Sequence, residues 1–515
     1  MKRNILYKST RSSTDPVAAS EALLRGLAPD GGLYVPTEMP LLSDLDDGGD
    51  LTAALEKLCE MDYRSLAVSV MGLLLTDFGE EELRECADKA YGSGFDDGQI
   101  APLVKKDGMY YLELFHGRTI AFKDMALSIL PHLMTAASRK LGNKKDIVIL
   151  TATSGDTGKA ALAAFADVPG TKIIVFYPKY GVSPVQERQM VTQRGSNVRV
   201  IGITGNFDDA QSGVKEMLSD STLAGELDAA GCRFSSANSI NIGRLVPQIA
   251  YYVWAYTRLV KSGAITVGRP INVAVPTGNF GNILACYYAK KMGLPVKKLI
   301  CASNKNKVLY DFFTTGAYDR NREFYVTSSP SMDILVSSNL ERLIYEIAGC
   351  DPEKCRLLMR SLAESGRYEL TEEMREKLSC FEAEYADEDD TAAEIARVFS
   401  KEGYVIDPHT AVASCAARLF KERSEDMACG VTSDSPVVVV STASPFKFTG
   451  TVLGALSRES AGDDLEAAET LARLSGRPIP RAVSELKDAQ ILHDTVCGKD
   501  EMRRQVTDFL KKPTC

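Results

Sequence analysis

Short apolar runs rich in β-branched residues alternate with amphipathic helical patterns through the middle of this chain. Continuous apolar runs separated by helices are typical of strands that are buried on both faces of a parallel sheet. The pattern therefore predicts an α/β fold with open, mostly parallel sheets flanked by helices. The expected strands cover residues 147–150, 173–176, 198–203, 271–275 and 437–440.

Two regions depart from this alternation. Residues 1–95 contain amphipathic helical patterns and the turn sequence Pro29-Asp30-Gly31-Gly32, so we expect a smaller, mixed N-terminal region there. Residues 351–401 are strongly charged but keep apolar residues at helical spacing, among them Leu378 and Ile395. This combination favours a helical insertion with a solvated face.

The composition indicates a globular protein that acts on a small molecule. Of its 515 residues, 45% are hydrophobic and 25% are charged, which is enough for more than one core. The net charge of -9 and the lack of a long basic run disfavour binding to nucleic acid or to an anionic membrane. No apolar run is long enough to span a bilayer. We expect a cytoplasmic protein, monomeric, with a homodimer as the alternative.

Cysteine and histidine spacing disfavours a metal site. The 12 cysteines include no Cys-x-x-Cys pair, and the four histidines do not form a His-Glu-x-x-His motif. A Gly-x-Ser-x-Gly nucleophile elbow is also missing from the sequence. Metalloprotease and serine-hydrolase functions therefore lose their usual support, and no metal is expected.

A lysine stands at the start of a predicted helix, directly after an apolar pair. It is Lys123, within the segment His116–Asp124, and helical spacing continues over 125–133. Burial beside Ala121 and Phe122 would favour the neutral form of its amine, which is the nucleophile toward an aldehyde. Taken alone, the segment is better explained by an ordinary surface lysine at a helix start, because the chain has 60 lysines and arginines.

A loop rich in glycine and hydroxyl groups follows the strand 147–150. It covers residues 151–158 and leads into a helical run at 159–165. Backbone N–H groups at such a helix start suit a carboxylate or a phosphate. The loop is not a nucleotide-binding P-loop, because Thr153 and Ala160 stand where that motif requires a glycine and a Mg²⁺-binding hydroxyl.

A second loop of this kind covers residues 276–282 and follows the strand 271–275. It contains two glycines and two asparagines immediately before the helical run 283–292. Such a loop predicts a phosphate-binding nest built from backbone N–H groups. A simple helix cap is the alternative explanation.

A third element follows the last strong strand, at residues 441–448. Thr442 could donate a hydrogen bond to a ring nitrogen of a buried cofactor without protonating that nitrogen. Serine and threonine at a strand end are also common in turns, so this element is weak evidence by itself.

Together, and in this order, these motifs resemble those of the threonine synthase family. The enzymes of this family have the tryptophan-synthase-β fold type and depend on pyridoxal 5'-phosphate. The resemblance implies a fold-type-II architecture with an N-terminal region at 1–95. It further implies a large cofactor-binding domain from 96–145 and 241–515, and a small substrate-binding domain at 146–240. Further matching segments are 7–11, 26–36, 205–211, 238–241 and 329–334.

The same resemblance assigns roles to individual residues. Lys123 would be the catalytic residue and would hold the cofactor as a Schiff base. Asp156 stands where related enzymes often have an asparagine facing the cofactor ring. The other cofactor-binding residues would be Gly278, Asn279, Phe280, Asn282 and Thr442. Ser154, Gly155 and Thr157 would bind the substrate carboxylate, and the candidate cations for the substrate phosphate are Arg118, Arg244 and Lys447.

The family reaction converts O-phospho-L-homoserine and water into L-threonine and phosphate, with the Lys123 amine carrying protons at Cα and Cβ. This chain departs from the family at Arg118, where proline is usual, and at Ser444-Pro445-Phe446, where His-Pro-Ala is usual. Because the second change removes an imidazole and adds bulk near Thr442, a phospho-lyase that releases phosphate and 2-oxobutyrate from a related substrate stays open as an alternative. A non-catalytic protein that binds the cofactor is a second alternative, and the intact Lys123 argues against it.

Overall fold

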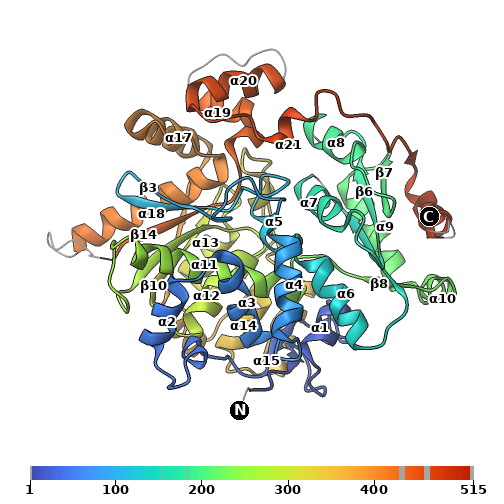
Figure 1. The fold of residues 1–515 in the computed structure, drawn as a ribbon, viewed down its shortest axis with the longest axis horizontal. Coiled ribbons are helices and arrows are strands. Elements are labelled where there is room, and N and C mark those ends of the chain that lie inside the picture. The colour runs from blue at the N-terminus through green and yellow to red at the C-terminus, as the bar shows by residue number, and fades with distance from the viewer. Residues whose placement is uncertain (1–2, 154, 183, 428–434, 457–463, 511–515) are drawn as a thin grey trace.

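Two mostly parallel sheets form the framework of the protein (Figure 1). The computed structural model describes residues 3–153, 155–182, 184–427, 435–456 and 464–510. In the larger sheet β3 is antiparallel to β4 and the other neighbours are parallel, whereas every pair in the smaller sheet is parallel. The larger sheet has the strand order β13 (Phe381–Tyr385), β10 (Val296–Ser303), β9 (Ile271–Pro276), β14 (Val437–Ser441), β4 (Met109–Glu113) and β3 (Leu103–Lys106). The smaller sheet has the order β15 (Val496–Cys497), β7 (Val198–Ile203), β6 (Thr171–Pro178), β5 (Asp146–Ala152) and β8 (Cys232–Ser235).

The larger sheet is buried on both faces, which explains why its central strands are continuously apolar. Ala274 and Val439 pack in one hydrophobic cluster together with residues of helix α18 (Pro408–Met427). Their neighbours Val273 and Val440 point to the other face, in the cluster that includes helix α12 (Gly281–Lys291). Alternate residues of one strand thus enter two different cores. The α/β fold and all five predicted strands are confirmed.

The predicted N-terminal region is present and packs on the large sheet's helical layer. Its strands β1 (Tyr7–Ser9) and β2 (Tyr34–Pro36) pair in antiparallel fashion. Helix α3 lies against α11 (Ile242–Lys261), a long and almost wholly buried helix. The helices of this region are α1 (Ala19–Arg25), the 3₁₀ turn η1 (Leu42–Leu45), α2 (Leu51–Cys59), α3 (Tyr63–Leu74) and α4 (Glu80–Ala90).

The charged segment 351–401 is not the purely helical insertion that its composition predicts. It contains the strand β12 (Arg367–Glu369), which pairs with β11 (Ala317–Asp319), and β13, which extends the large sheet beside β10. In β13 the buried residues Phe381 and Ala383 alternate with glutamates, and this period of two is that of a strand and not that of the predicted helix. The helices in this segment are α15 (Pro352–Ser365), α16 (Glu372–Glu376) and α17 (Glu388–Glu402).

The smaller sheet takes a strand from the end of the chain. β15 pairs with β7, so one strand from the range predicted for the large domain lies in the small sheet. The division of the chain into domains stays a prediction. The helices around this sheet are α7 (Asp156–Phe165), α8 (Pro184–Val191), α9 (Phe207–Ser219), α10 (Ser221–Ala229), the 3₁₀ turn η4 (Lys499–Glu501) and α22 (Met502–Leu510).

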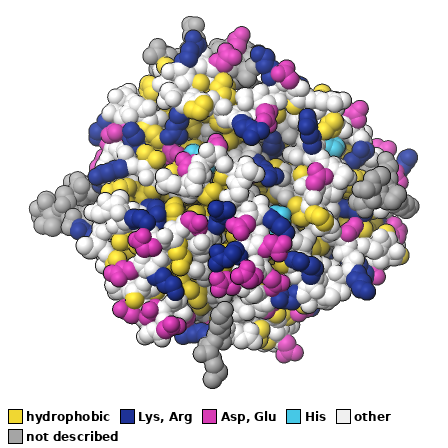
Figure 2. Space-filling model, in the orientation of Figure 1, with side chains coloured by type: hydrophobic (Ala, Val, Ile, Leu, Met, Phe, Trp, Pro, Cys, Tyr) yellow, Lys and Arg dark blue, Asp and Glu magenta, His cyan; other side chains and the backbone are white. Residues whose placement is uncertain are grey.

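The remaining helices surround the larger sheet. Figure 2 shows basic and acidic side chains interspersed over the face in view. None of the helices in the described part of the chain combines the length and the apolar surface that crossing a bilayer requires. The remaining elements are α5 (Lys123–Leu127), α6 (Leu130–Lys140), α13 (Val308–Thr315), η2 (Pro330–Met332), α14 (Leu340–Ile347), η3 (Pro445–Lys447), α19 (Thr449–Ala455), α20 (Asp464–Ser475) and α21 (Arg481–Ser484).

Candidate active site

The segment that carries Lys123 is pinned to the carboxyl end of β14. Phe122 donates its N–H to the carbonyl of Thr442 (2.8 Å), and Ser444 donates its N–H to the carbonyl of Ile120 (3.0 Å). The helical pattern after Lys123 forms two helices, α5 and α6, instead of one. Pro131 opens the first turn of α6, where a proline is tolerated but cannot continue a preceding helix.

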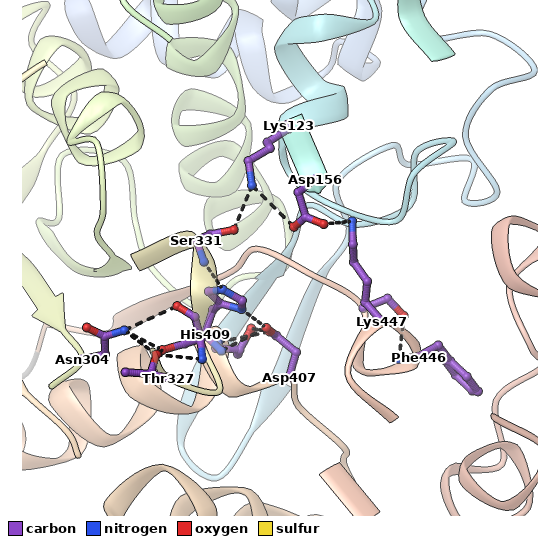
Figure 3. Close-up of polar contacts among 12 residues, drawn as sticks. Lys123, Asp156, Asn304, Thr327, Ser331, Asp407, His409, Phe446 and Lys447 are labelled. Carbon is purple, nitrogen blue, oxygen red and sulfur yellow. Dashed lines mark hydrogen bonds and ion pairs between the residues drawn. The ribbon is translucent and has the colours of Figure 1, made fainter. Parts of the chain in front are cut away.

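The Lys123 amine lies in the interior between a hydroxyl and a carboxylate (Figure 3). Its Nζ donates to Ser331 Oγ at 2.9 Å and lies 3.6 Å from Asp156 Oδ2, and the side chain is 12% exposed. Burial lowers the pKa of Lys123, the carboxylate of Asp156 opposes this shift, and the charges of Lys447 and Arg244 add to it. The amine is therefore easier to deprotonate than a surface lysine.

Asp156 is ionised because two ammonium groups face it. Lys447 Nζ lies 2.9 Å from Asp156 Oδ1 and also donates to the carbonyl of Thr119 at 3.1 Å. Burial alone would raise the pKa of Asp156, but the charges of Lys447 and Lys123 hold it well below its usual range. Asp156 is also the first residue of α7, where the helix dipole favours a negative charge.

The loop that leads into α7 is organised by Thr153. Its Oγ1 accepts hydrogen bonds from the N–H groups of Gly155 and Gly158, both at 3.0 Å. Gly155 has a φ of 147°, and a Cβ there would overlap the side chain of Gln186. Thr157 is half-buried in the first turn of α7, and Ser154 lies outside the described residues.

The loop 276–282 at the end of β9 has the features of a phosphate site. Phe280 adopts the left-handed conformation (φ 63°) immediately before α12, an unfavourable geometry for a residue with a side chain. Asn282 Oδ1 accepts from the hydroxyls of Tyr251 (2.7 Å) and Tyr252, while its amide nitrogen is buried with no partner within the described structure. An unpaired buried donor costs free energy, so this amide and the free N–H groups of the α12 N-terminus fit a bound phosphate group.

Close packing restricts the same loop. A Cβ at Gly278 would overlap the carbonyl oxygen of Ser331, so only glycine fits there without a shift. The carbonyl of Asn279 accepts from the side chain of Asn339, at the start of α14, at 3.0 Å. The loop is thus held by the Ser331 turn and by Asn339.

Thr442 is buried at the end of β14, beside the Lys123 segment, and the preceding Ser441 hydroxyl is buried without a partner in the described structure. Ser444 Oγ caps the next turn by accepting from the N–H of Phe446 (3.3 Å). The Phe446 ring belongs to the hydrophobic cluster that contains α18 and points away from Lys123 in Figure 3. The bulk of Phe446 therefore goes into the core and does not crowd the amine.

The two candidate arginines lie in different surroundings. Arg118 is exposed, and its guanidinium contacts the carbonyl of Ala163 in α7 at 3.5 Å. Arg244 is buried and donates to the carbonyl of Ala237 at 2.7 Å, whereas its Nε has no partner in the described structure. Burial lowers the pKa of Arg244 to about 10. The structure thus brings Arg244 and Lys447 close enough to Lys123 to affect its pKa, and directs Arg118 toward α7.

Three residues behind Lys123 have no role predicted from the sequence. Ser331 contacts the amine, and His409 and Asp407 lie behind Ser331 (Figure 3). The sequence Asp407-Pro408-His409 has the signature of a helix start, since an aspartate cap precedes a proline. That signal predicts a cap, but it does not predict which distant residue the histidine contacts.

Comparison with known proteins identifies the family. Three family descriptions match successive parts of the chain: Threonine synthase N terminus at 6–91, Pyridoxal-phosphate dependent enzyme at 99–442 and Threonine synthase, C-terminal at 410–496. The crystal structure of a pyridoxal-phosphate-bound threonine synthase from Brucella melitensis is 35% identical with a TM-score of 0.83, over 99% of this chain and 100% of that chain.

Curated relatives agree with this. Threonine synthase of Saccharomyces cerevisiae is 33% identical over 88% of this chain and 89% of its own length. Threonine synthase-like 1 of Macaca fascicularis is 39% identical over 88% of this chain, which spans only 60% of that longer relative. The predicted resemblance is confirmed, and so is the fold-type-II architecture. The chain belongs to the threonine synthase family of pyridoxal-phosphate-dependent enzymes.

Proposed function

We propose that this chain is a threonine synthase, a carbon–oxygen lyase acting on phosphate, which converts O-phospho-L-homoserine and water into L-threonine and phosphate. The observation that carries the proposal is the buried Lys123 amine, held between Ser331 and an ionised Asp156 in a member of this family. As in the sequence prediction, the protein would act in the cytoplasm as a monomer on a small molecule.

Pyridoxal 5'-phosphate, when bound, would supply an aldehyde for the Lys123 amine and a conjugated ring that withdraws electrons from the substrate carbon. The unpaired amide of Asn282 and the N–H groups of the loop 278–280 would hold its phosphate. Thr442 would donate its hydroxyl to the ring nitrogen. Asp156, already ionised, would face the ring from α7.

Lys123 would carry the protons of the reaction. A neutral amine is needed to accept a proton from the substrate Cα, and burial together with Lys447 and Arg244 favours that neutral form. The protonated amine that results would be stabilised by the carboxylate of Asp156, 3.6 Å away, until Nζ gives up the proton and can accept the next one, from Cβ. Conversion to threonine removes one hydrogen from Cβ and adds one at Cγ. The opposing effects of burial and Asp156 suit an amine that must gain and lose a proton in each cycle.

The substrate would bind between the two sheets. The loop of Ser154, Gly155 and Thr157 would take its carboxylate, as part of a substrate-binding domain at 146–240, and the cofactor would bind to the large domain formed by 96–145 and 241–515. For the substrate phosphate, Arg244 is the better candidate of the two arginines because its Nε is buried and unpaired. Lys447 could contribute through its charge while it remains paired with Asp156.

Product analysis tests this proposal. Purified protein is given pyridoxal 5'-phosphate and O-phospho-L-homoserine, and phosphate, threonine and 2-oxobutyrate are measured in the same sample. Equal release of phosphate and threonine is expected. Phosphate with 2-oxobutyrate would instead establish a phospho-lyase, and an imine absorbance band without any product would indicate a protein that only binds the cofactor.

The matched variants are Lys123→Ala and Lys140→Ala. Loss of the Lys123 amine is expected to abolish the imine band and to lower turnover at least about a thousandfold, since general acid–base catalysis and the covalent link disappear together. Lys140 lies on α6 in an ion pair with Glu82, and its substitution should leave both readouts unchanged. Turnover retained by Lys123→Ala would contradict the proposed mechanism.

A further inference from the structure

One short turn contacts both parts of the candidate cofactor site. The turn is η2, and Ser331 is its central residue. The hydroxyl of Ser331 accepts from Lys123 Nζ at 2.9 Å, while its carbonyl oxygen packs so closely on Gly278 that a Cβ there would overlap it. The position of this turn therefore sets the spacing between the amine and the loop 276–282.

A buried histidine holds the backbone of this turn. His409 Nε2 accepts the N–H of Ser331 at 3.1 Å, and His409 Nδ1 lies 2.7 Å from Asp407 Oδ2. The side chains of His409 and Asp407 are 3% and 0% exposed. Since Nε2 must accept the N–H of Ser331, the proton is assigned to Nδ1, which donates it to the carboxylate of Asp407. Both ring nitrogens thus have a hydrogen-bond partner, which fixes the orientation of the ring.

Asp407 is in turn fixed by the start of α18. Its carboxylate accepts from the N–H groups of His409 (3.0 Å) and Thr410 (3.1 Å) and from the hydroxyl of Thr410. Capping the helix requires only the aspartate. The histidine adds something that a cap does not need, a hydrogen bond to a residue 78 positions away in the chain.

The far side of the turn is anchored separately. Asn304 Nδ2 donates to Asp333 Oδ1 and to Thr327 Oγ1, both at 2.8 Å, and Thr327 donates its N–H to Asp333 Oδ2 at 2.9 Å. Asn304 directly follows β10, so this network ties the turn to the end of the large sheet. The turn is held at its base by this network and at its centre by His409.

We propose that Asp407 and His409 are positioning residues that hold the Ser331 turn, so that the Ser331 hydroxyl receives the Lys123 amine at a fixed distance from the phosphate loop. The inference rests on the proposed role of Lys123 as the lysine that binds the cofactor. It assigns a task to a buried Asp–His pair that the proposed chemistry does not otherwise use.

The test follows formation of the imine between the cofactor and Lys123 by its absorbance band. The full chain, freed of cofactor, is mixed with pyridoxal 5'-phosphate, and the rate and affinity are measured. His409→Ala and Ser331→Ala should each slow imine formation on the order of tenfold, the effect of losing one buried hydrogen bond. His409→Gln should recover most of the rate, because its carboxamide oxygen can accept the N–H of Ser331.

Two controls separate positioning from folding. His493→Gln alters another buried histidine, which contacts the carbonyl of Gln193 in the part of the chain next to α8, and should leave the rate unchanged. Thermal unfolding of each variant reports loss of the fold. Ser331→Ala removes only a hydroxyl, so it tests the contact with Lys123 even if His409→Ala does not fold.

The outcomes are distinct. Wild-type rates in both His409→Ala and Ser331→Ala would overturn the inference, as would equal slowing in His409→Gln and His409→Ala. If the wild-type chain forms no imine at all, the proposed role of Lys123 fails, and with it the basis of this inference.

Discussion

Buried ionisable side chains set the electrostatics of the candidate site, and Lys159 is one that the proposed mechanism leaves unused. It lies in α7, one turn after Asp156, and its Nζ has a long contact of 3.5 Å with the carbonyl of Gln189. Burial lowers the pKa of Lys159 to about 7, the charge of Lys447 adds to this shift, and Asp124 and Asp156 oppose it. Such a lysine destabilises the folded state whenever it must be charged.

Replacing Lys159 by methionine should therefore stabilise the protein in a pH-dependent way. Between pH 7 and 10.5 the unfolded chain binds a proton that the folded chain has lost, so the free energy of unfolding of the wild type rises with pH in this range. We expect Lys159→Met to gain about 2 kcal/mol at pH 7 and below, and the gain to vanish as the pH approaches 10.5.

Urea unfolding at pH 6, 7.5 and 9 measures this difference. Lys297→Met is the matched control, because Lys297 is exposed on β10 and its replacement should change little at any pH. A gain for Lys159→Met that is equal at all three pH values would contradict the assignment, since it would reflect packing instead of charge.

At the scale of elements, the fit between the loop 276–282 and the turn η2 controls the candidate phosphate site. Gly278→Ala places a methyl group against the backbone carbonyl of Ser331, which cannot move aside as a flexible side chain could. The loop or the turn must shift, and we expect affinity for pyridoxal 5'-phosphate to fall by about tenfold or more, with a loss of stability of about 1–3 kcal/mol.

Absorbance titration with the cofactor and thermal unfolding check this prediction. Gly225→Ala serves as the control. It also adds a methyl group, within helix α10, but nothing lies within 4 Å of the added Cβ. Wild-type cofactor affinity in Gly278→Ala would show that the contact between loop and turn is not restrictive.

The elements that could be predicted from the sequence are those whose pattern reflects local burial. The strand 271–275 is apolar throughout because both of its faces are covered, and the glycines and asparagines after it indicate a loop at a strand end. β13 escaped prediction because its glutamates are paired at the surface: Glu382 lies 2.7 Å from Lys298, and Glu384 pairs with Arg423. A charged edge strand resembles a helix face when only composition is considered.

The contacts behind Lys123 could not be predicted for a different reason. Ser331 and His409 are far apart in the chain, and only the fold brings the turn η2 and the start of α18 to the same place. Local patterns single out Lys123, the loop 151–158 and the loop 276–282 as candidates. They contain no information on which distant side chain each of these contacts.

At the scale of the whole molecule, the C-terminal part of the chain joins the two sheets. After α21 it passes along α8 and then adds β15 to the smaller sheet (Figure 1). Gln189 donates to the carbonyl of Ala482, and Leu492 donates its N–H to the carbonyl of Val191. The smaller sheet is thus held by a segment that begins beside the larger one.

Arg188 binds this segment through its guanidinium, which donates to the carbonyls of Leu486 (2.7 Å), Lys487 (3.3 Å) and Ala489 (3.2 Å). Arg188→Ala should release the C-terminal segment and lower the free energy of local opening of the smaller sheet by about 1–3 kcal/mol. Hydrogen exchange would then be faster in β7 and β15 but unchanged in β9, which lies in the other sheet. The exposed neighbour Arg194 provides the control, since Arg194→Ala should leave exchange unaltered. Equal acceleration in β9 would mean that Arg188 supports the whole fold and not the connection between the sheets.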